Sequence, residues 1–195
     1  MTHDSQDEGP DLSGLVLVGL DLQDPFIRSL TEADRFFRRC SFVLEAARLL
    51  DIPVLLTEQV PDKLGPTSEQ LTGAAGSPTV FGKTSFSCFG ADGLEPLLKE
   101  REVRHLLVAG LETPICVYQS VIDAIDKGYE VTLLSDCVGA RRADDAAVAL
   151  RAMNAAGAHV LPAETVIYSI LGDTAHPAFR DITALVKRQG HPENS

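Results

Sequence analysis

The chain has 195 residues, of which 45% are hydrophobic and 23% are charged. This length suits one sizeable α/β domain and is too short for two domains of ordinary size. The fractions of hydrophobic and charged residues exclude a disordered, collagenous or coiled-coil chain. The formal net charge of -11 argues against binding to nucleic acid or to an anionic membrane surface, because both need clustered Lys and Arg.

The two ends of the chain are expected to be tails around one domain. Residues 1–13 are polar and acidic, residues 14–190 carry the apolar segments, and residues 191–195 form a short C-terminal tail. No apolar run approaches the roughly 18 residues of a membrane span, and the first residues do not resemble a signal peptide. The four cysteines show no CxxC spacing. We therefore predict a cytoplasmic protein with reduced thiols.

Strand-like and helix-like segments alternate along the chain. Short apolar runs predict buried strands at 15–20, 53–57, 80–81, 103–109, 130–134 and 159–161. Helices are predicted between and after them at 31–50 (with Thr31 as N-cap), 94–100, 114–127, 144–156 and 177–187. Residues 58–79 contain three Pro and three Gly, which predicts a long loop. The alternation indicates a single three-layer α/β/α, Rossmann-like domain with a parallel sheet.

Three reactive side chains stand out by their positions. Asp21 directly follows an apolar strand, at the sheet edge where α/β proteins bind ligands, although a helix cap or turn would also explain it. Lys83 is a lone cation in the stretch 71–91, where a solvated loop lysine is the alternative. Cys116 lies in the first turn of a predicted helix, where the helix dipole lowers the pKa of a thiol, although free cysteines are mostly core residues.

Motifs for other chemistries are incomplete or absent. Gly82-Lys83-Thr84 resembles the end of a phosphate-binding P-loop, but the position that should hold the first glycine is Ser77, so nucleotide binding is the weaker interpretation. No GxGxxG follows the first strand, and the chain contains no GxSxG. The five histidines are scattered without metal-ligand spacing.

Three further motifs follow one another along the chain: Leu20-Asp21-Leu22-Gln23, Phe81-Gly82-Lys83-Thr84 and Gly110-Leu111-Glu112-Thr113-Pro114-Ile115-Cys116-Val117. In their order and spacing they resemble the motifs of the isochorismatase-like cysteine hydrolases. The likeness extends over residues 14–188, and segments at 57–59, 64–67 and 135–138 are most similar to the YcaC-related branch. The resemblance implies a six-stranded, mostly parallel sheet, a homo-oligomer (a dimer, tetramer or octamer), and a catalytic triad of Asp21, Lys83 and Cys116.

Elementary chemistry supports the roles that this resemblance implies. A Cys116 thiolate would attack a carbonyl carbon, Lys83 would favour the thiolate by charge pairing, and Asp21 would carry the proton to the leaving amine. The resemblance also implies a cis peptide bond between Leu111 and Glu112. This bond would direct the backbone N–H groups of Glu112 and Cys116 at the oxyanion.

The chain departs from the zinc-dependent members of the family. Nicotinamidase-type members carry an Asp-x-His…His site after the second strand, whereas residues 57–63 contain no histidine. We therefore predict no metal, no cofactor, and hydrolysis of a non-peptide, amide-like C–N bond in a small molecule through a thioester-type intermediate. A catalytically silent binding or scaffold protein of the same fold is the alternative. Candidate pocket residues are Gln23, Phe26, Gln59, Thr84, Ser85, Phe86 and Thr113.

Overall fold

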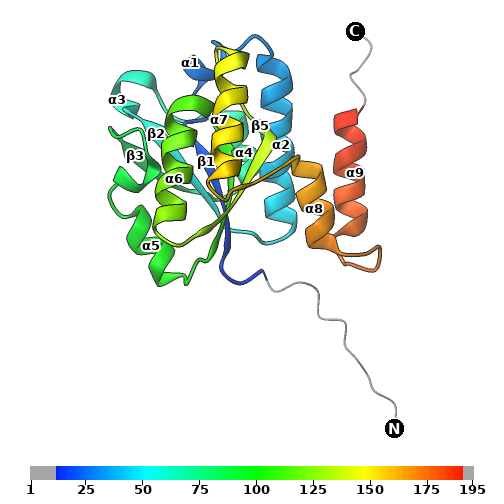
Figure 1. Cartoon of the computed structure of the whole chain (residues 1–195). Coiled ribbons are helices and arrows are strands. Elements are labelled where there is room, and N and C mark those ends of the chain that lie inside the picture. The colour runs from blue at the N-terminus through cyan, green and yellow to red at the C-terminus, as the bar shows by residue number, and fades with distance from the viewer. Residues whose placement is uncertain (1–11, 191–195) are drawn as a thin grey trace.

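A single six-stranded sheet forms the centre of the computed structural model, which describes residues 12–190 (Figure 1). The strands lie in the order β3-β2-β1-β4-β5-β6, and every neighbouring pair is parallel. Their bounds are β1 (Leu15–Leu20), β2 (Val54–Gln59), β3 (Thr79–Lys83), β4 (His105–Gly110), β5 (Glu130–Val138) and β6 (His159–Leu161). The predicted fold class is confirmed, and the sheet is parallel throughout rather than for the most part.

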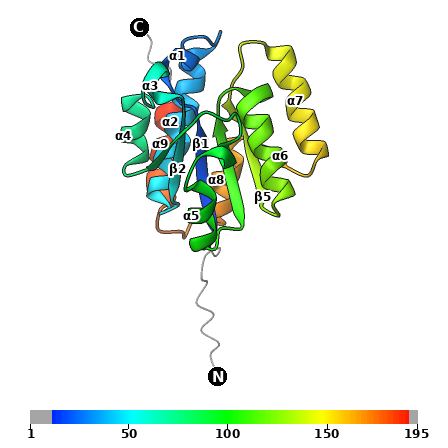
Figure 2. The same ribbon diagram turned by 90° about the vertical axis from the view of Figure 1, so that its left-hand side faces the viewer.

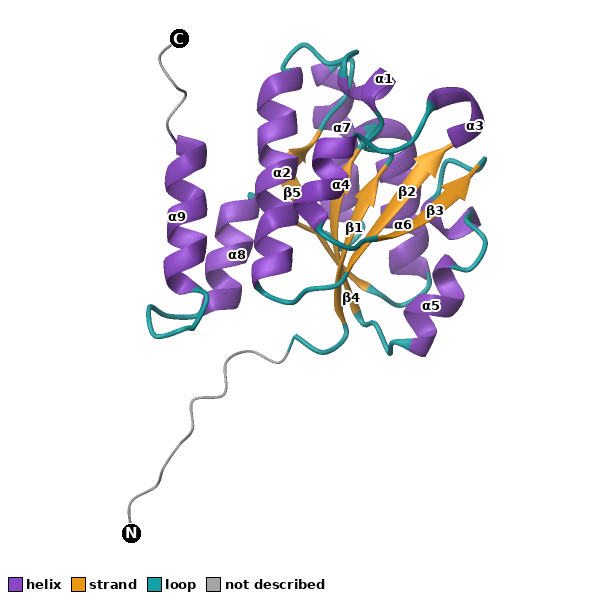
Figure 3. Cartoon of the chain, turned by 180° about the vertical axis from the view of Figure 1, so that it is seen from behind, coloured by secondary structure: helices purple, strands orange, loops and turns teal. Residues whose placement is uncertain are grey.

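Helices cover both faces of this sheet. Figure 2 shows α4 and α9 on one side and α6 and α7 on the other, and Figure 3 shows the first of these layers in front of the strands. One face carries α1 (Asp24–Ile27), α2 (Ala33–Leu49), α4 (Glu69–Ala75), α8 (Ala163–Leu171) and α9 (Phe179–Gly190), and the other carries α5 (Leu94–Glu100), α6 (Tyr118–Asp126) and α7 (Ala143–Ala155). Leu17 packs into one apolar cluster, and its neighbours Val16 and Val18 pack into the other. A strand buried on both faces is therefore a continuous apolar run.

The strand order reverses between β1 and β4, and their carboxyl ends mark the point where such sheets bind ligands. The two strands approach closely at Gly110, which has a φ of 126° and where a Cβ would meet the backbone of Leu20. A glycine alone satisfies both conditions. Asp21, the next residue after β1, has a φ of 53°, which is uncommon for a residue with a side chain. Positive-φ backbone thus occurs on both strands where they end at this edge of the sheet.

The predicted loop at 58–79 is wrong, because it contains α4 and a short helix, α3 (Pro61–Leu64). Pro61 begins α3, and Gly65 and Gly76 follow α3 and α4 with positive φ. Proline and glycine mark helix starts and stops as well as loops, so composition did not separate the two. Leu71 on α4 is fully buried, and its packing decides the outcome.

Other boundaries also differ from the sequence prediction. Helices α1 and α8 were not predicted, and α8 contains the strand-prone run Thr165-Val166-Ile167, whose apolar side chains pack on the core. The N-cap of α2 is Glu32 rather than Thr31, and β5 continues to Val138. The predicted tails lie outside the described residues, except for residues 12 and 13; Leu12 packs against the core.

Candidate active site

Asp21, Lys83 and Cys116 converge at the carboxyl edge of the sheet. Asp21 follows β1, Lys83 is the last residue of β3, and Cys116 follows β4. The Lys83 Nζ lies 2.8 Å from Oδ2 of Asp21, and these two side chains are 0% and 1% exposed. The buried Cys116 borders the same cavity as Asp21, and the charges of Asp21 and Lys83 both act on the pKa of its thiol. The structure therefore brings the three predicted residues into one buried cluster.

Lys83 is enclosed by oxygen atoms. Besides the Asp21 carboxylate, its Nζ donates to Oε1 of Gln59 at 2.6 Å and to the carbonyls of Ser85 and Phe86, both at 3.2 Å. A buried ammonium is tolerated when its charge is paired and its donors are engaged. The alternative of a solvated loop lysine is therefore wrong.

Asp21 is held by β2 as well as by Lys83. Its backbone N–H donates to the Thr57 carbonyl at 3.0 Å, and the Thr57 hydroxyl donates to Oδ1 at 2.8 Å. Burial raises the pKa of the Asp21 carboxyl above its usual value, although Lys83 and Thr57 oppose this effect. The side chain caps no helix, since the N-cap of α1 is Gln23. Its backbone does form a turn after β1, with a φ of 53° and a hydrogen bond from the Gln23 N–H to the Asp21 carbonyl at 2.7 Å, while its carboxylate is held by Lys83 and Thr57.

Cys116 lies on a π-helical turn, η2 (Thr113–Val117), which leads into α6. Two backbone N–H groups of the turn donate to the Glu112 carbonyl, at 3.0 and 3.1 Å. The backbone N–H and the hydroxyl of Thr113 both donate to the Gly139 carbonyl at 2.9 Å, which ties the turn to the end of β5. The thiol is therefore fixed relative to two strands.

The surroundings of Cys116 favour the protonated thiol. Burial and the Asp21 carboxylate raise its pKa to about 12, although Lys83 and the backbone N–H of Glu112 oppose them. The pKa lowering predicted from the helix dipole and Lys83 is therefore wrong, because desolvation is large and the lysine is already paired. The Leu111–Glu112 peptide bond is cis, as the family resemblance implied.

A cavity of about 320 Å³ borders both Asp21 and Cys116. Three predicted pocket residues, Phe26, Gln59 and Phe86, form part of its wall. The complete lining consists of Asp21, Pro25, Phe26, Ser29, Gln59, Phe86, Leu111, Glu112, Ile115, Cys116 and Arg141. The cluster is therefore accessible to a small molecule from one side.

The other four predicted pocket residues are absent from this lining and support it from behind. The fully buried Gln23 donates to the Gln59 carbonyl at 3.1 Å and accepts from the Gln59 backbone N–H at 2.7 Å. The Thr84 carbonyl accepts from Nε2 of Gln59 at 2.9 Å, and the Ser85 carbonyl accepts from the lysine ammonium. Thr113 anchors the nucleophile turn. These residues position wall groups instead of contacting the cavity.

Sequence reasoning missed an ion pair in the cavity wall. Arg141, in the loop after β5, donates from Nε to both carboxylate oxygens of Glu112 at 3.1 Å and from its backbone N–H at 2.7 Å. Burial opposes ionisation of Glu112, but these bonds outweigh it, and the pKa of Glu112 lies below its usual value. The sequence feature that could have identified Arg141 as a site residue is its position after a predicted strand, at the ligand-binding edge of the sheet.

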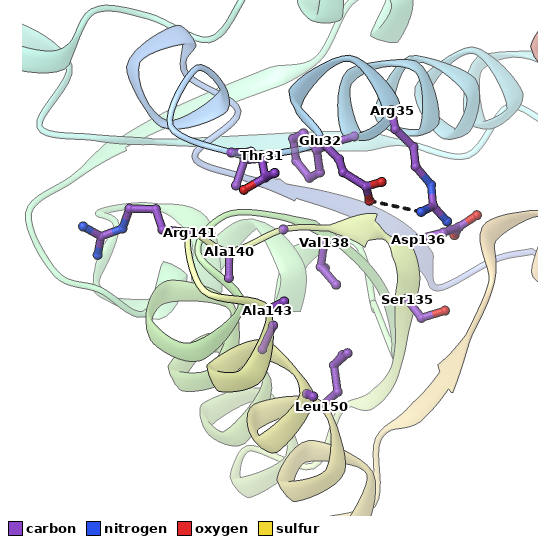
Figure 4. Close-up of a pocket in the computed structure, with 15 residues that line it drawn as sticks. Thr31, Glu32, Arg35, Ser135, Asp136, Val138, Ala140, Arg141, Ala143 and Leu150 are labelled. Atoms are coloured by element: carbon purple, nitrogen blue, oxygen red, sulfur yellow. Dashed lines mark hydrogen bonds and ion pairs between the residues drawn. The ribbon is translucent and has the colours of Figure 1, made fainter. Parts of the chain in front are cut away.

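Arg141 also borders a second cavity of about 330 Å³, between the start of α2 and α7 (Figure 4). In that view its side chain extends away from Ala143 and Leu150. The neighbouring Arg35 and Glu32 pair with each other at 3.1 Å. Arg141 thus borders both cavities, and its guanidinium pairs with Glu112 in the wall of the Cys116 cavity.

The other cysteines, Cys40, Cys88 and Cys137, are free, buried and outside the lining of the Cys116 cavity. Burial raises the pKa of Cys88 to about 12 and that of Cys137 well above its usual value. Within residues 12–190, no group of three or more His, Cys, Asp or Glu side chains is arranged to hold a metal ion. In the same range, no helix combines the length and the apolarity that a membrane crossing requires.

Proteins of known family match most of the chain. The isochorismatase domain family model matches residues 15–165. Isochorismatase domain-containing protein 2 of Xenopus laevis is 33% identical over 171 residues, which cover 88% of this chain and 82% of that protein. The Homo sapiens protein of the same name is 34% identical over 173 residues, with the same two coverages.

Solved structures agree with this match. The MAR1 ribonuclease of Caenorhabditis elegans is 28% identical, with a TM-score of 0.84 and 92% of each chain covered. YcaC of Pseudomonas aeruginosa is 18% identical, with a TM-score of 0.82 over 98% of this chain and 100% of that one. The likeness to YcaC is thus one of fold, while the other two relatives are closer in sequence. From the family match and these similarities, the chain belongs to the isochorismatase domain family of hydrolases.

Proposed function

We propose that this protein is a cysteine hydrolase that cleaves the C–N bond of a small amide. Cys116 is the nucleophile, Asp21 the general acid and base, and Lys83 the electrostatic support. The observation that carries the proposal is that Cys116 and Asp21, which is paired with Lys83 at 2.8 Å, border one cavity of about 320 Å³. Membership of a hydrolase family supports it.

Acylation starts from a thiol rather than a preformed thiolate, since the pKa of Cys116 is raised to about 12. Asp21 accepts the thiol proton while Sγ adds to the substrate carbonyl carbon, which gives a tetrahedral intermediate. When the C–N bond breaks, the proton held by Asp21 moves to the leaving nitrogen. The products of this half-reaction are a Cys116 thioester and a free amine or ammonia.

Deacylation uses the same groups in reverse. Water attacks the thioester carbon, and Asp21 accepts a proton from the water and passes it to the departing sulfur. A carboxylic acid leaves, and the thiol is restored. The raised pKa of Asp21 suits a group that gains and loses a proton in each half-reaction. The steps as proposed require no metal ion or cofactor.

The backbone N–H groups of Glu112 and Cys116 are the proposed donors to the oxyanion. The N–H of Glu112 already faces the thiol, where it lowers the pKa of Cys116. A carbonyl oxygen on the carbon that Sγ attacks would lie beside this donor. The bonds that tie η2 to β5 keep the donor in place during the reaction, which is the condition for electrostatic stabilisation.

Ribonuclease activity is a second candidate, because the MAR1 relative carries that name. RNA binding depends on cations that phosphates can reach. The cation in the cavity wall, Arg141, is paired with Glu112, and the chain carries a net charge of -11. The charge pattern therefore favours amide hydrolysis over RNA cleavage.

A panel of small amides, ureides and carbamates tests the proposed hydrolysis. We expect release of ammonia or amine from at least one compound, together with an acyl adduct that intact-mass and peptide mass spectrometry map to Cys116. Single-stranded RNA belongs in the same panel. A panel without any turnover, in a protein whose Cys116 can still be alkylated, would favour a catalytically silent binding protein. RNA cleavage without amide hydrolysis would favour the second candidate.

We also propose that the chain forms a homo-oligomer. The structurally similar YcaC of Escherichia coli is described as an octameric hydrolase of unknown specificity, with a TM-score of 0.80 and 18% identity to this chain. Sedimentation equilibrium should give a mass of at least twice the 20.9 kDa of one chain. A mass of one chain at micromolar concentration would contradict this expectation.

A further inference from the structure

The charged side chains that border the Cys116 cavity are already paired within the described part of the protein. Asp21 pairs with Lys83, and Glu112 pairs with Arg141. The side-chain amide of Gln59 is engaged at both ends, by the lysine ammonium and by a backbone carbonyl. A ligand therefore meets few polar side chains that still need a partner. The proposed oxyanion donors, at the reacting carbonyl, are backbone groups.

Apart from Cys116 and Ser29, whose hydroxyl donates to the Phe26 carbonyl at 2.6 Å, the rest of the wall is apolar. It consists of Pro25, Phe26, Phe86, Leu111 and Ile115. Phe86 is 53% exposed, so a ligand packed against its ring removes apolar surface from water, at about 25 cal/mol per Å². A volume of about 320 Å³ stands at the small end of the range of ligand pockets, roughly 300 to 1,000 Å³. These properties fit a compact apolar group beside the reacting carbonyl.

The Glu112–Arg141 ion pair makes the cavity unfavourable for charged ligands. Arg141 contacts both carboxylate oxygens, a geometry that is among the stronger charge-assisted pairings. The Arg141 side chain is 60% exposed, and a carboxylate ligand that took its Nε and Nη2 donors would displace Glu112, whose side chain is 13% exposed and would lose its counter-charge. An ammonium ligand would compete with Arg141 for Glu112 in the same way. In either case the ligand forms one ion pair but breaks another, so the number of ion pairs does not increase.

We propose that the cavity selects a small uncharged amide with a compact apolar substituent, and that the Glu112–Arg141 pair enforces this choice. Turnover of such an amide rests on the hydrolysis proposed above, whereas its selective binding does not. Arg141 and the Glu112 side chain are thus specificity-determining groups, distinct from the proton-transfer cluster of Asp21, Lys83 and Cys116.

Two amides of nearly equal size test the selectivity. In 3-methylbutanamide an isopropyl group occupies the place that a carboxylate occupies in malonamate (3-amino-3-oxopropanoate). We expect kcat/KM to be about 100-fold higher for 3-methylbutanamide, the order of effect that follows from leaving one charged group without its partner. Binding of both compounds to the Cys116→Ala variant, measured by calorimetry, should show the same preference without turnover.

Charge variants test the role of the ion pair. Glu112→Gln keeps the backbone N–H but leaves the Arg141 cation without its carboxylate, so malonamate should gain at least about tenfold relative to 3-methylbutanamide. Arg28→Gln is the matched control, because Arg28 pairs with Asp24 on the surface and lies outside the cavity lining. The control should keep the wild-type ratio.

Each outcome separates selectivity from hydrolysis. Preferential binding of the neutral amide without any turnover supports the selectivity and overturns the proposed reaction. Faster or equal turnover of malonamate overturns the selectivity and leaves the reaction standing, as does an unchanged ratio in Glu112→Gln. If that variant does not fold, Arg141→Gln gives the reciprocal test with the cation 3-aminopropanamide. Binding of this cation relative to 3-methylbutanamide should then rise. A fall or no change in this ratio overturns the role of the pair.

Discussion

Replacing Cys116 with alanine should lower kcat at least about a thousandfold for any amide that the wild-type protein hydrolyses. The loss is large because Sγ forms the covalent intermediate in the proposed reaction, and water held by the remaining groups is a poorer substitute. The free energy of unfolding should change by about 1 kcal/mol or less, since a single sulfur atom is removed from the edge of a cavity. Steady-state kinetics and thermal unfolding measure the two effects separately.

Cys88→Ala is the matched control for this experiment. Cys88 and Cys116 are both buried, at 2% and 6% exposure, and burial raises the pKa of both thiols to about 12. Cys88 lies outside the cavity lining, so its replacement should leave kcat near the wild-type value. Equal losses of activity in two folded variants would assign the effect to packing and would deprive Cys116 of its role as nucleophile.

Local patterns predicted the strands and the positions of Asp21 and Cys116 for physical reasons. β1 and β4 are buried on both faces, so they are apolar runs in the sequence, and each run ends where a ligand-binding edge begins. Asp21 and Cys116 could be placed at that edge by counting from these runs. Lys83 was placed by the motif that it shares with the family, and the structure then put it at the end of β3.

Pairings between distant segments were not predictable from local patterns. Arg141 meets Glu112 across 29 positions, and Gln23 meets Gln59 across 36, and neither spacing corresponds to a helical or strand period. The prediction of a lowered pKa for Cys116 was wrong for the same reason. The helix that follows the thiol can be read locally, whereas desolvation and the approach of Asp21 arise from the packed fold.

Substitutions of Asp21 and Lys83 should shift the pKa of Cys116 in opposite directions while both lower turnover. The Asp21 carboxylate raises the pKa of the thiol and Lys83 lowers it. Asp21→Asn should therefore lower this pKa and increase the thiolate fraction near neutral pH, and Lys83→Met should do the reverse. Turnover falls in Asp21→Asn in spite of the larger thiolate fraction, because the proton carrier is gone.

Each single substitution also leaves a buried charge without its partner. Removing one member of a buried pair costs about 3–5 kcal/mol of stability, and both side chains of this pair are at most 1% exposed. The double variant Asp21→Asn/Lys83→Met removes both charges and should lose less stability than the sum of the single variants. Melting temperatures of the three proteins establish which of them are folded at the temperature of the kinetic experiments.

Alkylation of Cys116 by iodoacetamide, followed by peptide mass spectrometry from about pH 6 to 10, reads the pKa changes directly. In the wild-type protein the rate should rise about tenfold per pH unit across this range, because the pKa of about 12 lies above it. Cys116 in Asp21→Asn should be alkylated faster than in the wild-type protein at neutral pH, although the less basic thiolate is a weaker nucleophile and reduces the gain. In Lys83→Met it should be alkylated more slowly than in the wild-type protein. Cys40, fully buried on α2 and outside the cavity lining, reports any general opening of the fold. If Asp21→Asn slowed alkylation of Cys116 while Cys40 stayed protected, the carboxylate would be helping to ionise the resting thiol, and proton transfer during attack would no longer explain the site.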